Sequence, residues 1–150
     1  MKQALTFFVI LLATQQIFAQ AQGIVALPAP KPDLTVTTFT VDSPAVLHCG
    51  TQTITVSWTE KNRSRGIAAA HNSAVYINGG PTFLIPIGTL SAGQSQSGTT
   101  TATFYNGPCD CLPTSYTIPI FMKADWYNTV AETNETNNNS ATVTQSAACP

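Results

Sequence analysis

The sequence predicts an all-β fold, specifically an immunoglobulin-like antiparallel β-sandwich of about seven strands. Apolar and polar residues alternate with a period of two in several short segments, and turn signals separate these segments. No window shows a convincing helical periodicity. Threonine, a residue that favours strands, accounts for 23 of the 150 residues. Many short alternating strands with regular turns are typical of a two-sheet sandwich.

The segment before the domain has the pattern of a secretory signal peptide, which we assign to residues 1–21. Lys2 precedes an apolar run at Ala4–Ala13, and Ala19 and Ala21 supply the small residues that a signal peptidase requires. An apolar run of this length is too short to cross a hydrocarbon core of about 30 Å. We therefore expect a secreted, extracellular protein with no membrane insertion.

Residues 22–32 combine an apolar arm with a proline-rich linker. The arm consists of Ile24, Val25, Ala26 and Leu27, and the linker contains Pro28, Pro30 and Pro32. Alternating prolines favour a stiff, extended connector. The arm has two interpretations. It is an additional edge strand of its own domain, or it is a strand donated to the sheet edge of a neighbouring copy.

The domain itself is expected at residues 33–145, followed by a C-terminal tail at 146–150. Its predicted strands cover residues 33–42, 51–60, 74–78, 83–87, 99–104, 116–126 and 141–144. The second strand places Trp58 in the core, and Asn78-Gly79-Gly80 predicts a hairpin after the third. Pro86 marks the fourth as an edge strand. Pro119 conflicts with a central sixth strand, so we expect either a bulge there or a strand boundary that differs from the predicted one.

Four cysteines follow the signal peptide: Cys49, Cys109, Cys111 and Cys149. An even number in an exported chain predicts two disulfides. A Cys109–Cys111 bridge would close a small, strained ring, so the pairing that contains it ranks last. The predicted topology brings the other positions to one pole, which predicts Cys49 paired with Cys109 or Cys111 and Cys149 with the remaining one. A bridge from Cys149 to a neighbouring molecule is the alternative.

The charge pattern excludes one class of partner, and the motifs disfavour another class of function. Only 9% of the residues are charged and the formal net charge is −1, so no basic surplus exists to neutralise nucleic-acid phosphates. His48 and His71 are the only histidines, and neither lies in a recognisable catalytic motif. We expect no enzymatic activity.

The acidic and amide side chains concentrate between the last two predicted strands. The candidate metal ligands are Asp125, Asn128, Glu132, Glu135 and Asn138. Carboxylate and amide oxygens are the hard ligands that calcium takes, and a loop that doubles back can make them converge. The sequence therefore predicts a calcium site. The alternative is that these side chains cap the turns of the loop backbone.

Four segments carry a resemblance to a known family: Asp33–Val36, Val56–Asn62, Gly88–Ser95 and, most specific, Ala124–Asn138. Together they resemble the CARDB domain, the cell-adhesion-related domain of bacteria, over roughly residues 33–145. The resemblance implies an immunoglobulin-like sandwich on a secreted or surface protein, usually in tandem arrays or beside catalytic domains. It implies no chemistry. This chain departs from the pattern as a lone domain with four cysteines.

These observations predict a non-catalytic structural protein, a calcium-binding subunit of an extracellular fibre or matrix whose partners are copies of itself. The alternative is a soluble adhesion or glycan-binding module that recognises a cell-surface glycan or protein. In that case the loop aromatics Trp126 and Tyr127 would stack on sugar faces, although core or interface packing is their more ordinary use.

Overall fold

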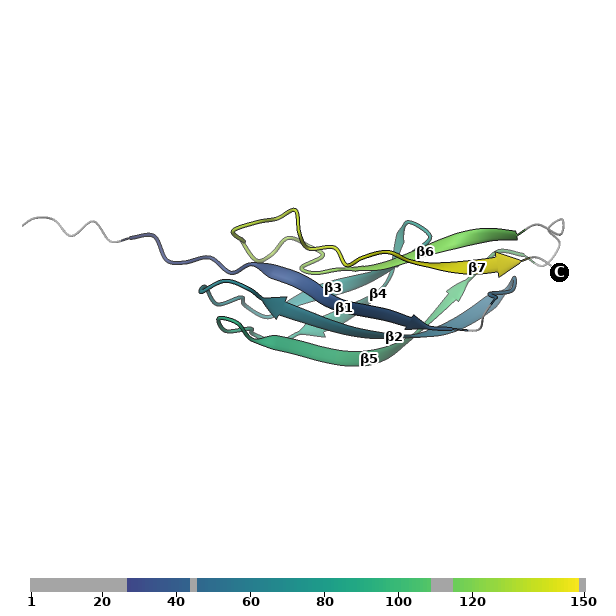
Figure 1. The fold of residues 1–150 in the computed structure, drawn as a ribbon, viewed down its shortest axis with the longest axis horizontal. Coiled ribbons are helices and arrows are strands. Elements are labelled where there is room, and N and C mark those ends of the chain that lie inside the picture. Colours follow the sequence, from purple (N-terminus) through teal and green to yellow (C-terminus); the bar gives the residue numbers. More distant parts are fainter. Residues whose placement is uncertain (1–26, 44–45, 109–114, 149–150) are drawn as a thin grey trace, which may run out of the picture.

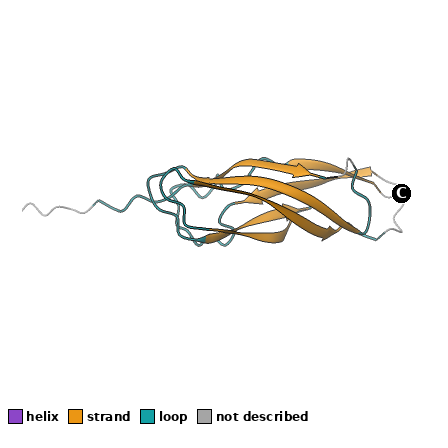
Figure 2. Ribbon diagram, turned by 90° about the horizontal axis from the view of Figure 1, so that it is seen from below, coloured by secondary structure: helices purple, strands orange, loops and turns teal. Residues whose placement is uncertain are grey.

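The computed structural model describes residues 27–43, 46–108 and 115–148, which form two antiparallel β-sheets packed face to face (Figures 1 and 2). One sheet has the order β1-β2-β5, with β1 at Leu34–Asp42, β2 at Thr51–Asn62 and β5 at Ser95–Tyr105. The other has the order β4-β3-β6-β7, with β3 at His71–Ile77, β4 at Gly80–Ile87, β6 at Ser115–Lys123 and β7 at Val143–Ala148. The predicted seven-stranded sandwich is confirmed.

The core lies between the two sheets and follows from the alternation along the strands. Ile54, Val56 and Trp58 of β2 point inward and are buried. They belong to the same buried cluster as Ile120 and Met122 of β6. Burying a side chain of this size contributes about 1.5–3 kcal/mol. The predicted core position of Trp58 is therefore confirmed.

The alternation in β1 changes phase, and a β-bulge explains why. Leu34 and Val36 are buried at even positions, whereas Phe39 and Val41 pack against the core from odd positions. The pairing of β1 with β2 shifts register between Val36 and Thr38. One extra residue at this point turns the rest of the strand over, which keeps both apolar pairs on the inner side.

The two prolines expected to disturb the sheets have different outcomes. Pro86 lies in β4, which is an edge strand as predicted. The bulge expected at Pro119 is wrong, because β6 pairs with β7 through Pro119 without a register shift. On its other side, the pairing of β6 with β3 ends at Ile120. The Pro119 carbonyl still accepts a hydrogen bond from the Asn78 N–H at 3.0 Å, so the missing proline N–H falls where that ladder ends.

Hydroxyl side chains occupy the outer face of the β2–β5 pair. Three cross-strand pairs have their oxygens within hydrogen-bonding distance: Thr53–Thr103 at 3.2 Å, Ser57–Thr99 at 3.1 Å and Thr59–Ser97 at 2.9 Å. This arrangement makes the outer side of the edge strand β5 polar, which limits unwanted pairing with other strands.

The chain enters and leaves the sandwich at opposite ends of its long axis. In Figure 1 the segment before β1 extends from one end, and β7 finishes at the other. Strand β2 continues to Asn62, two residues beyond its predicted end at residue 60. Within the described part of the chain, no helix is long and apolar enough to span a bilayer.

Candidate functional site

The loop between β6 and β7 contains all five predicted metal ligands, and the first of them caps a turn. Asp125 is fully buried and adopts a positive φ of 39°. Its Oδ1 accepts hydrogen bonds from the Thr129 N–H at 3.0 Å and the Thr129 hydroxyl at 2.8 Å, and its Oδ2 accepts one from the Val130 N–H at 2.8 Å. Both carboxylate oxygens are thus engaged by the loop's own backbone and side chains.

Glu132 ties the same loop to the beginning of β1. Its Oε2 accepts a hydrogen bond from the Leu34 N–H at 2.5 Å, and its Oε1 accepts one from the Asn138 side-chain amide at 2.8 Å. Burial raises the pKa of Glu132 to about 7, and the negative charges of Glu135 and Asp125 add to this, while the two hydrogen bonds oppose it. The structure thus holds a carboxylate that is costly to ionise.

The remaining polar residues of the loop extend this network. Glu135 Oε1 accepts a hydrogen bond from the Glu132 N–H at 2.8 Å, and the Asn137 amide donates to Asp33 Oδ1 at 2.8 Å. Asn128 stands apart: it is exposed, has a positive φ of 52°, and its Oδ1 lies 3.4 Å from Lys123 Nζ. The loop therefore brings Glu132, Glu135 and Asn138 together, while Asp125 and Asn128 serve other contacts.

The oxygen atoms of this loop provide one observation against a metal site and one in favour of it. Within the described ranges, no group of three or more acidic, histidine or cysteine side chains is placed to hold one. Two buried amide oxygens, Asn137 Oδ1 and Asn138 Oδ1, nevertheless have no hydrogen-bond partner there. Asp125 fits the alternative interpretation, in which these side chains cap the turns of the loop backbone. Metal binding by the five residues stays a prediction.

A second buried polar side chain, Asn62, forms hydrogen bonds that fix the chain segment preceding β1. Its Oδ1 accepts hydrogen bonds from the Asp33 N–H and the Ser64 N–H, both at 3.1 Å. Its amide donates to the Gly66 carbonyl at 2.6 Å and the Leu90 carbonyl at 3.0 Å. The predicted second strand ends at residue 60, two residues before Asn62. The position of Asn62 in phase with Trp58 is the signal that identifies it as buried.

The proline-rich linker is fixed by the same end of the sandwich. The Lys31 carbonyl accepts a hydrogen bond from the Ser64 hydroxyl at 2.6 Å, and the Pro32 carbonyl accepts one from the Thr133 N–H at 2.8 Å. Leu27, the last residue of the apolar arm, is 89% exposed. Ile24, Val25 and Ala26 lie outside the described residues, as does the predicted signal peptide.

The cysteine prediction falls largely outside the described residues. Cys49 is buried just before β2 and is not a free thiol. Cys109, Cys111 and Cys149 are not among the described residues, so the connectivity stays a prediction.

Sequence analysis did not identify a buried polar cluster between the two sheets. Glu60 of β2 is fully buried, and its Oε1 lies 2.6 Å from Nε2 of His71 in β3. The Ser73 hydroxyl donates to Glu60 Oε2 at 2.5 Å. The available signal was Glu60 itself, a charged residue in phase with Val56 and Trp58. The serine contacts the carboxylate rather than the imidazole, which is not the arrangement that activates a nucleophile.

The two loop aromatics pack against one another. The ring centroids of Trp126 and Tyr127 are 4.2 Å apart with an interplanar angle of 49°, and Tyr127 is 57% exposed. Trp126 is half-buried, and its N–H group in the backbone donates to the Asn72 carbonyl at 2.8 Å. This mutual packing leaves Tyr127 as the more accessible ring.

Comparison with solved structures gives similar folds. The CARDB domain of a Pyrococcus furiosus protein, crystallised in complex with di-metal ions, is 24% identical, covers 78% of this chain and 94% of its own, and has a TM-score of 0.55. A solution NMR structure of that domain is 23% identical, covers 83% and 100%, and also has a TM-score of 0.55. At this identity the likeness concerns the fold. Among curated proteins, none matches.

The family model gives the assignment. The CARDB model matches residues 31–142, which include the buried side chains of Asn62 and Glu132, the β6–β7 loop and every strand from β1 to β6. The segments that resemble this family, above all Ala124–Asn138, are those whose side chains fix the loop and the start of β1. On this match the chain belongs to the CARDB family.

Proposed function

We propose that this chain is a non-catalytic, secreted structural protein that assembles head to tail into an extracellular fibre or matrix. Membership of a cell-adhesion-related family supports an extracellular, adhesion-type role. The proposal adds the mode of assembly, in which one copy's N-terminal arm pairs with a sheet edge of the next. Contacts of this heterologous kind extend without closing.

The position of the connector carries the proposal. Lys31 and Pro32 are fixed to the sandwich by hydrogen bonds at one end of the long axis, and β7 finishes at the other (Figure 1). The connector residues 27–32 consequently extend away from the sandwich along this axis (Figure 1). A donated strand leaving in this direction reaches the far end of a neighbouring copy without bending back.

The surface chemistry supports self-association. Leu27 is exposed, and the sequence places three further apolar residues directly before it. An exposed apolar segment is stabilised by burial against a partner. The formal net charge of −1 and the low charge content provide little electrostatic repulsion between copies.

Electron microscopy of the secreted protein tests this mode of assembly. We expect filaments from the natural chain and monomers from a variant in which residues 24–27 are all serine. Tyr127→Ser, which alters an exposed hydrophobic side chain in the β6–β7 loop and not on an edge strand, is the control and leaves filaments intact. Monomers from the natural chain at high concentration, or filaments from the arm variant, would contradict the proposal.

The calcium component of the proposal rests on Glu132, Glu135 and Asn138. These residues share one hydrogen-bond network, and the side-chain oxygen Oδ1 of Asn138 has no hydrogen-bond partner within the described part of the chain. A CARDB domain of Pyrococcus furiosus was crystallised in complex with di-metal ions, which supports testing this chain for metal binding. Asp125, whose two oxygens are engaged, would shape the loop.

Calorimetric titration with calcium, followed by thermal unfolding, tests this component. We expect heat release and a higher Tm with calcium, both lost in Glu132→Gln. Asp42→Asn, which removes an exposed acid on β1, is the control and retains both. Neither heat nor a Tm shift at millimolar calcium would remove calcium from the proposal while leaving head-to-tail assembly intact.

The predicted disulfides complete the proposal. We expect gel mobility to change on reduction while the protein remains a monomer band in denaturing gels, as intramolecular bridges require. A ladder of multimers that disappears on reduction would instead place Cys149 in a bridge between molecules.

A further inference from the structure

Head-to-tail assembly requires a sheet edge that receives the arm of the next copy, and the described part of the sandwich has four edges. Strands β1 and β5 are the edges of one sheet, and β4 and β7 are the edges of the other. An edge strand leaves a row of backbone N–H and C=O groups unpaired, which a further strand can use. Strand direction, side-chain chemistry and the free backbone groups distinguish these edges.

Of these four edge strands, β4 alone runs toward the connector end. Strand β1 begins next to the connector, and β5 is parallel to it because both are antiparallel to β2. Strand β7 finishes at the far end, and the successive antiparallel pairs β7–β6, β6–β3 and β3–β4 reverse β4 relative to it (Figure 1). An arm from the next copy enters at the far end with its N-terminus leading. It therefore lies antiparallel to β4 and parallel to the other edges, and antiparallel pairing is slightly more stable.

The side chains of β4 match those of the arm. All four arm residues, 24–27, are apolar, so both faces of a strand that they form are apolar. Strand β4 is apolar on both faces as well. Phe83 and Ile85 face the core, with Phe83 only partly buried, and Leu84 lies on the outer face with 41% of its surface exposed. An added strand would cover Leu84 and extend the inner apolar row.

The other three edges suit an apolar arm less well. Hydroxyl side chains face outward on each of them: Thr38 and Thr40 on β1, Thr99 and Thr101 on β5, and Thr144 and Ser146 on β7. Part of the β7 edge is also occupied. The Leu47 N–H donates to the Ser146 carbonyl, and the Ala148 N–H donates to the Leu47 carbonyl, both at 2.9 Å.

The β4 backbone has unpaired groups at Leu84. The Pro86 carbonyl accepts a hydrogen bond from the Gln96 side-chain amide of β5 at 3.3 Å, so residue 86 faces away from β3. Asn72, its partner in β3, accordingly directs its carbonyl to the Trp126 N–H on its other side, at 2.8 Å. Because the direction of the backbone groups alternates, the N–H and C=O of Leu84 also face away from β3. No strand in the described ranges pairs with that side of β4.

Two prolines set the length of this open segment. Pro81 and Pro86 have no backbone N–H, so they confine further pairing on β4 to residues 82–85. That segment has four residues, as does the arm, and four residues of strand span about 13 Å. The prolines thus leave an opening that accepts a short strand and blocks a longer one.

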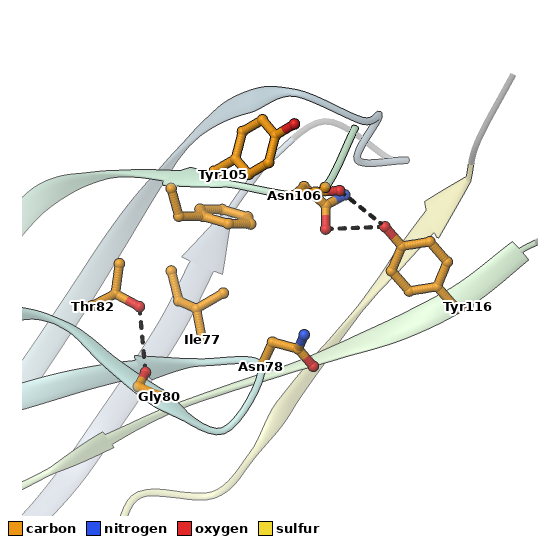
Figure 3. Close-up of a pocket in the computed structure, with 9 residues that line it drawn as sticks. Ile77, Asn78, Gly80, Thr82, Tyr105, Asn106 and Tyr116 are labelled. Atoms are coloured by element: carbon orange, nitrogen blue, oxygen red, sulfur yellow. Dashed lines mark hydrogen bonds between the residues drawn. The ribbon is translucent and has the colours of Figure 1, made fainter. Parts of the chain in front are cut away.

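The open segment of β4 begins beside a cleft at the far end of the sandwich. The cleft has a volume of about 450 Å³, and its lining includes Gly80 and Thr82 of β4 and Phe104 of β5. Figure 3 shows Gly80 and Thr82 at its wall, where the Thr82 hydroxyl donates to the Gly80 carbonyl at 3.4 Å. The arm of the next copy arrives at this end, so the cleft lies at the entrance to the β4 edge.

We propose that residues 82–85 of β4 are the site that receives the N-terminal arm of a neighbouring copy. The arm pairs antiparallel with this segment and bonds to the free N–H and C=O of Leu84. Its side chains pack against Leu84 on the outer face and continue the row of Phe83 and Ile85 on the inner face. This inference rests on head-to-tail assembly as the proposed function, and it adds which of the four edges accepts the arm.

A synthetic peptide with the sequence of residues 22–32 tests this edge directly. The receptor is the full secreted chain in which residues 24–27 are all serine, so that its own arm does not compete. We expect calorimetric titration to show binding, and Leu84→Lys in the receptor to weaken it about tenfold, because a charged side chain blocks the edge. Amide hydrogen exchange at Leu84 should slow when the peptide is bound.

The matched controls place the same charge on the other edges. Thr40→Lys, Thr101→Lys and Thr144→Lys alter exposed residues of β1, β5 and β7, and each should leave peptide binding unchanged. An unchanged Tm confirms that each variant retains its fold. In the chain with its natural arm, Leu84→Lys should abolish filaments, whereas Thr101→Lys should leave them intact.

The outcomes separate this inference from the proposed function. Absence of peptide binding at millimolar concentration, or equal binding by Leu84→Lys, would overturn the assignment of β4. Binding lost in one of the three control variants instead would also overturn it, and would place the arm on that edge with head-to-tail assembly intact. Peptide binding at β4 without filaments from the natural chain would support the edge site and reject the fibre.

Discussion

Glu60 and His71 face one another between the two sheets of the sandwich, with 2.6 Å separating Oε1 of the glutamate from Nε2 of the histidine. Nδ1 of His71 lies 2.8 Å from the Ala69 carbonyl oxygen, which can only accept. Both ring nitrogens therefore have acceptors opposite them when Glu60 is ionised. This geometry favours the imidazolium form and an ion pair between β2 and β3.

The pair makes stability depend on pH. Burial alone lowers the pKa of His71, but hydrogen bonds to Glu60 and Ala69, together with the charges of Glu60 and Asp125, raise it above its usual 6.5. The protonated form therefore stabilises the fold fully below pH 6.5. That contribution is lost as pH rises through the raised pKa of the folded state. Denaturant unfolding at increasing pH should show this decline.

Variants at Glu60 and His48 assign the decline to the right residue. Glu60→Gln should flatten the dependence above pH 6.5, because its amide can donate to a neutral imidazole and still accept from Ser73. His48→Gln, which removes the exposed histidine, should leave the dependence unchanged. Glu60→Ala should cost about 3–5 kcal/mol, since it leaves a buried partner unpaired. A slope that persists in Glu60→Gln would contradict the ion pair.

Glu132 is predicted to tolerate loss of its charge but not of its side chain. Glu132→Ala leaves the Leu34 N–H and the Asn138 amide without acceptors, at about 1–3 kcal/mol for each buried group. Glu132→Gln can bond to both after the Asn138 amide turns over, which also gives a partner to its unsatisfied oxygen. Because the carboxylate is costly to ionise here, the glutamine should unfold at nearly the natural free energy at pH 7.

Denaturant unfolding of both variants measures this difference. Glu135→Ala is the control for a loop carboxylate, since it removes only the bond from the Glu132 N–H. We expect it to cost less than Glu132→Ala. Equal losses in the glutamine and alanine variants at position 132 would show that the charge, rather than the two hydrogen bonds, holds the start of β1.

The strands were predictable because their signal is local. Alternation in β2 and the Asn-Gly turn after β3 depend on neighbouring residues, and the structure places both as expected. The failed bulge at Pro119 shows the limit of that logic, because whether a proline disturbs a ladder depends on where the partner strand ends. No local sequence pattern predicts that β3 ends before Asn78 and so leaves β6 without a partner on that side beyond Ile120.

The clustering of acidic and amide residues predicted where the candidate site lies, but not which contacts its side chains form. Spacing identified the β6–β7 loop, yet whether a carboxylate meets a cation or a backbone N–H is decided by contacts distant in sequence. Glu132 meets Leu34, which lies 98 residues away in the chain. His71 was assessed only against catalytic motifs, and its partner Glu60 is brought to it by the packing of two sheets.

Gly98 is predicted to be required by the indole of Trp58. A Cβ at position 98 would lie 2.8 Å from Cζ2 and 3.1 Å from Cε2 of that ring. The ring is packed in the core, so it cannot move aside without strain, and Gly98→Ala should destabilise the fold by about 1–3 kcal/mol. Gly88→Ala, whose Cβ would meet only Gln96 Oε1 at an ordinary 3.5 Å, is the control. Comparable thermal unfolding of the two variants would contradict this account.

Gly66 is predicted to control how firmly the connector is held. A Cβ there would lie 2.3 Å from both the Lys31 carbonyl carbon and the Pro30 carbonyl oxygen. Because these are backbone atoms, Gly66→Ala must displace the connector from the sandwich. The displacement should break the hydrogen bond from the Thr133 N–H to the Pro32 carbonyl. Amide hydrogen exchange at Thr133 should then become faster in the folded protein.

Gly80→Ala, where an added Cβ meets nothing within 4 Å, provides the comparison and should leave exchange at Thr133 unchanged. Head-to-tail assembly requires the arm to leave the sandwich in a fixed direction, so Gly66→Ala should also shorten or abolish filaments while the exposed arm itself is intact. Faster exchange at Thr133 with filaments of normal length would separate the two roles, because it would show that the arm's sequence suffices for assembly without a rigid connector.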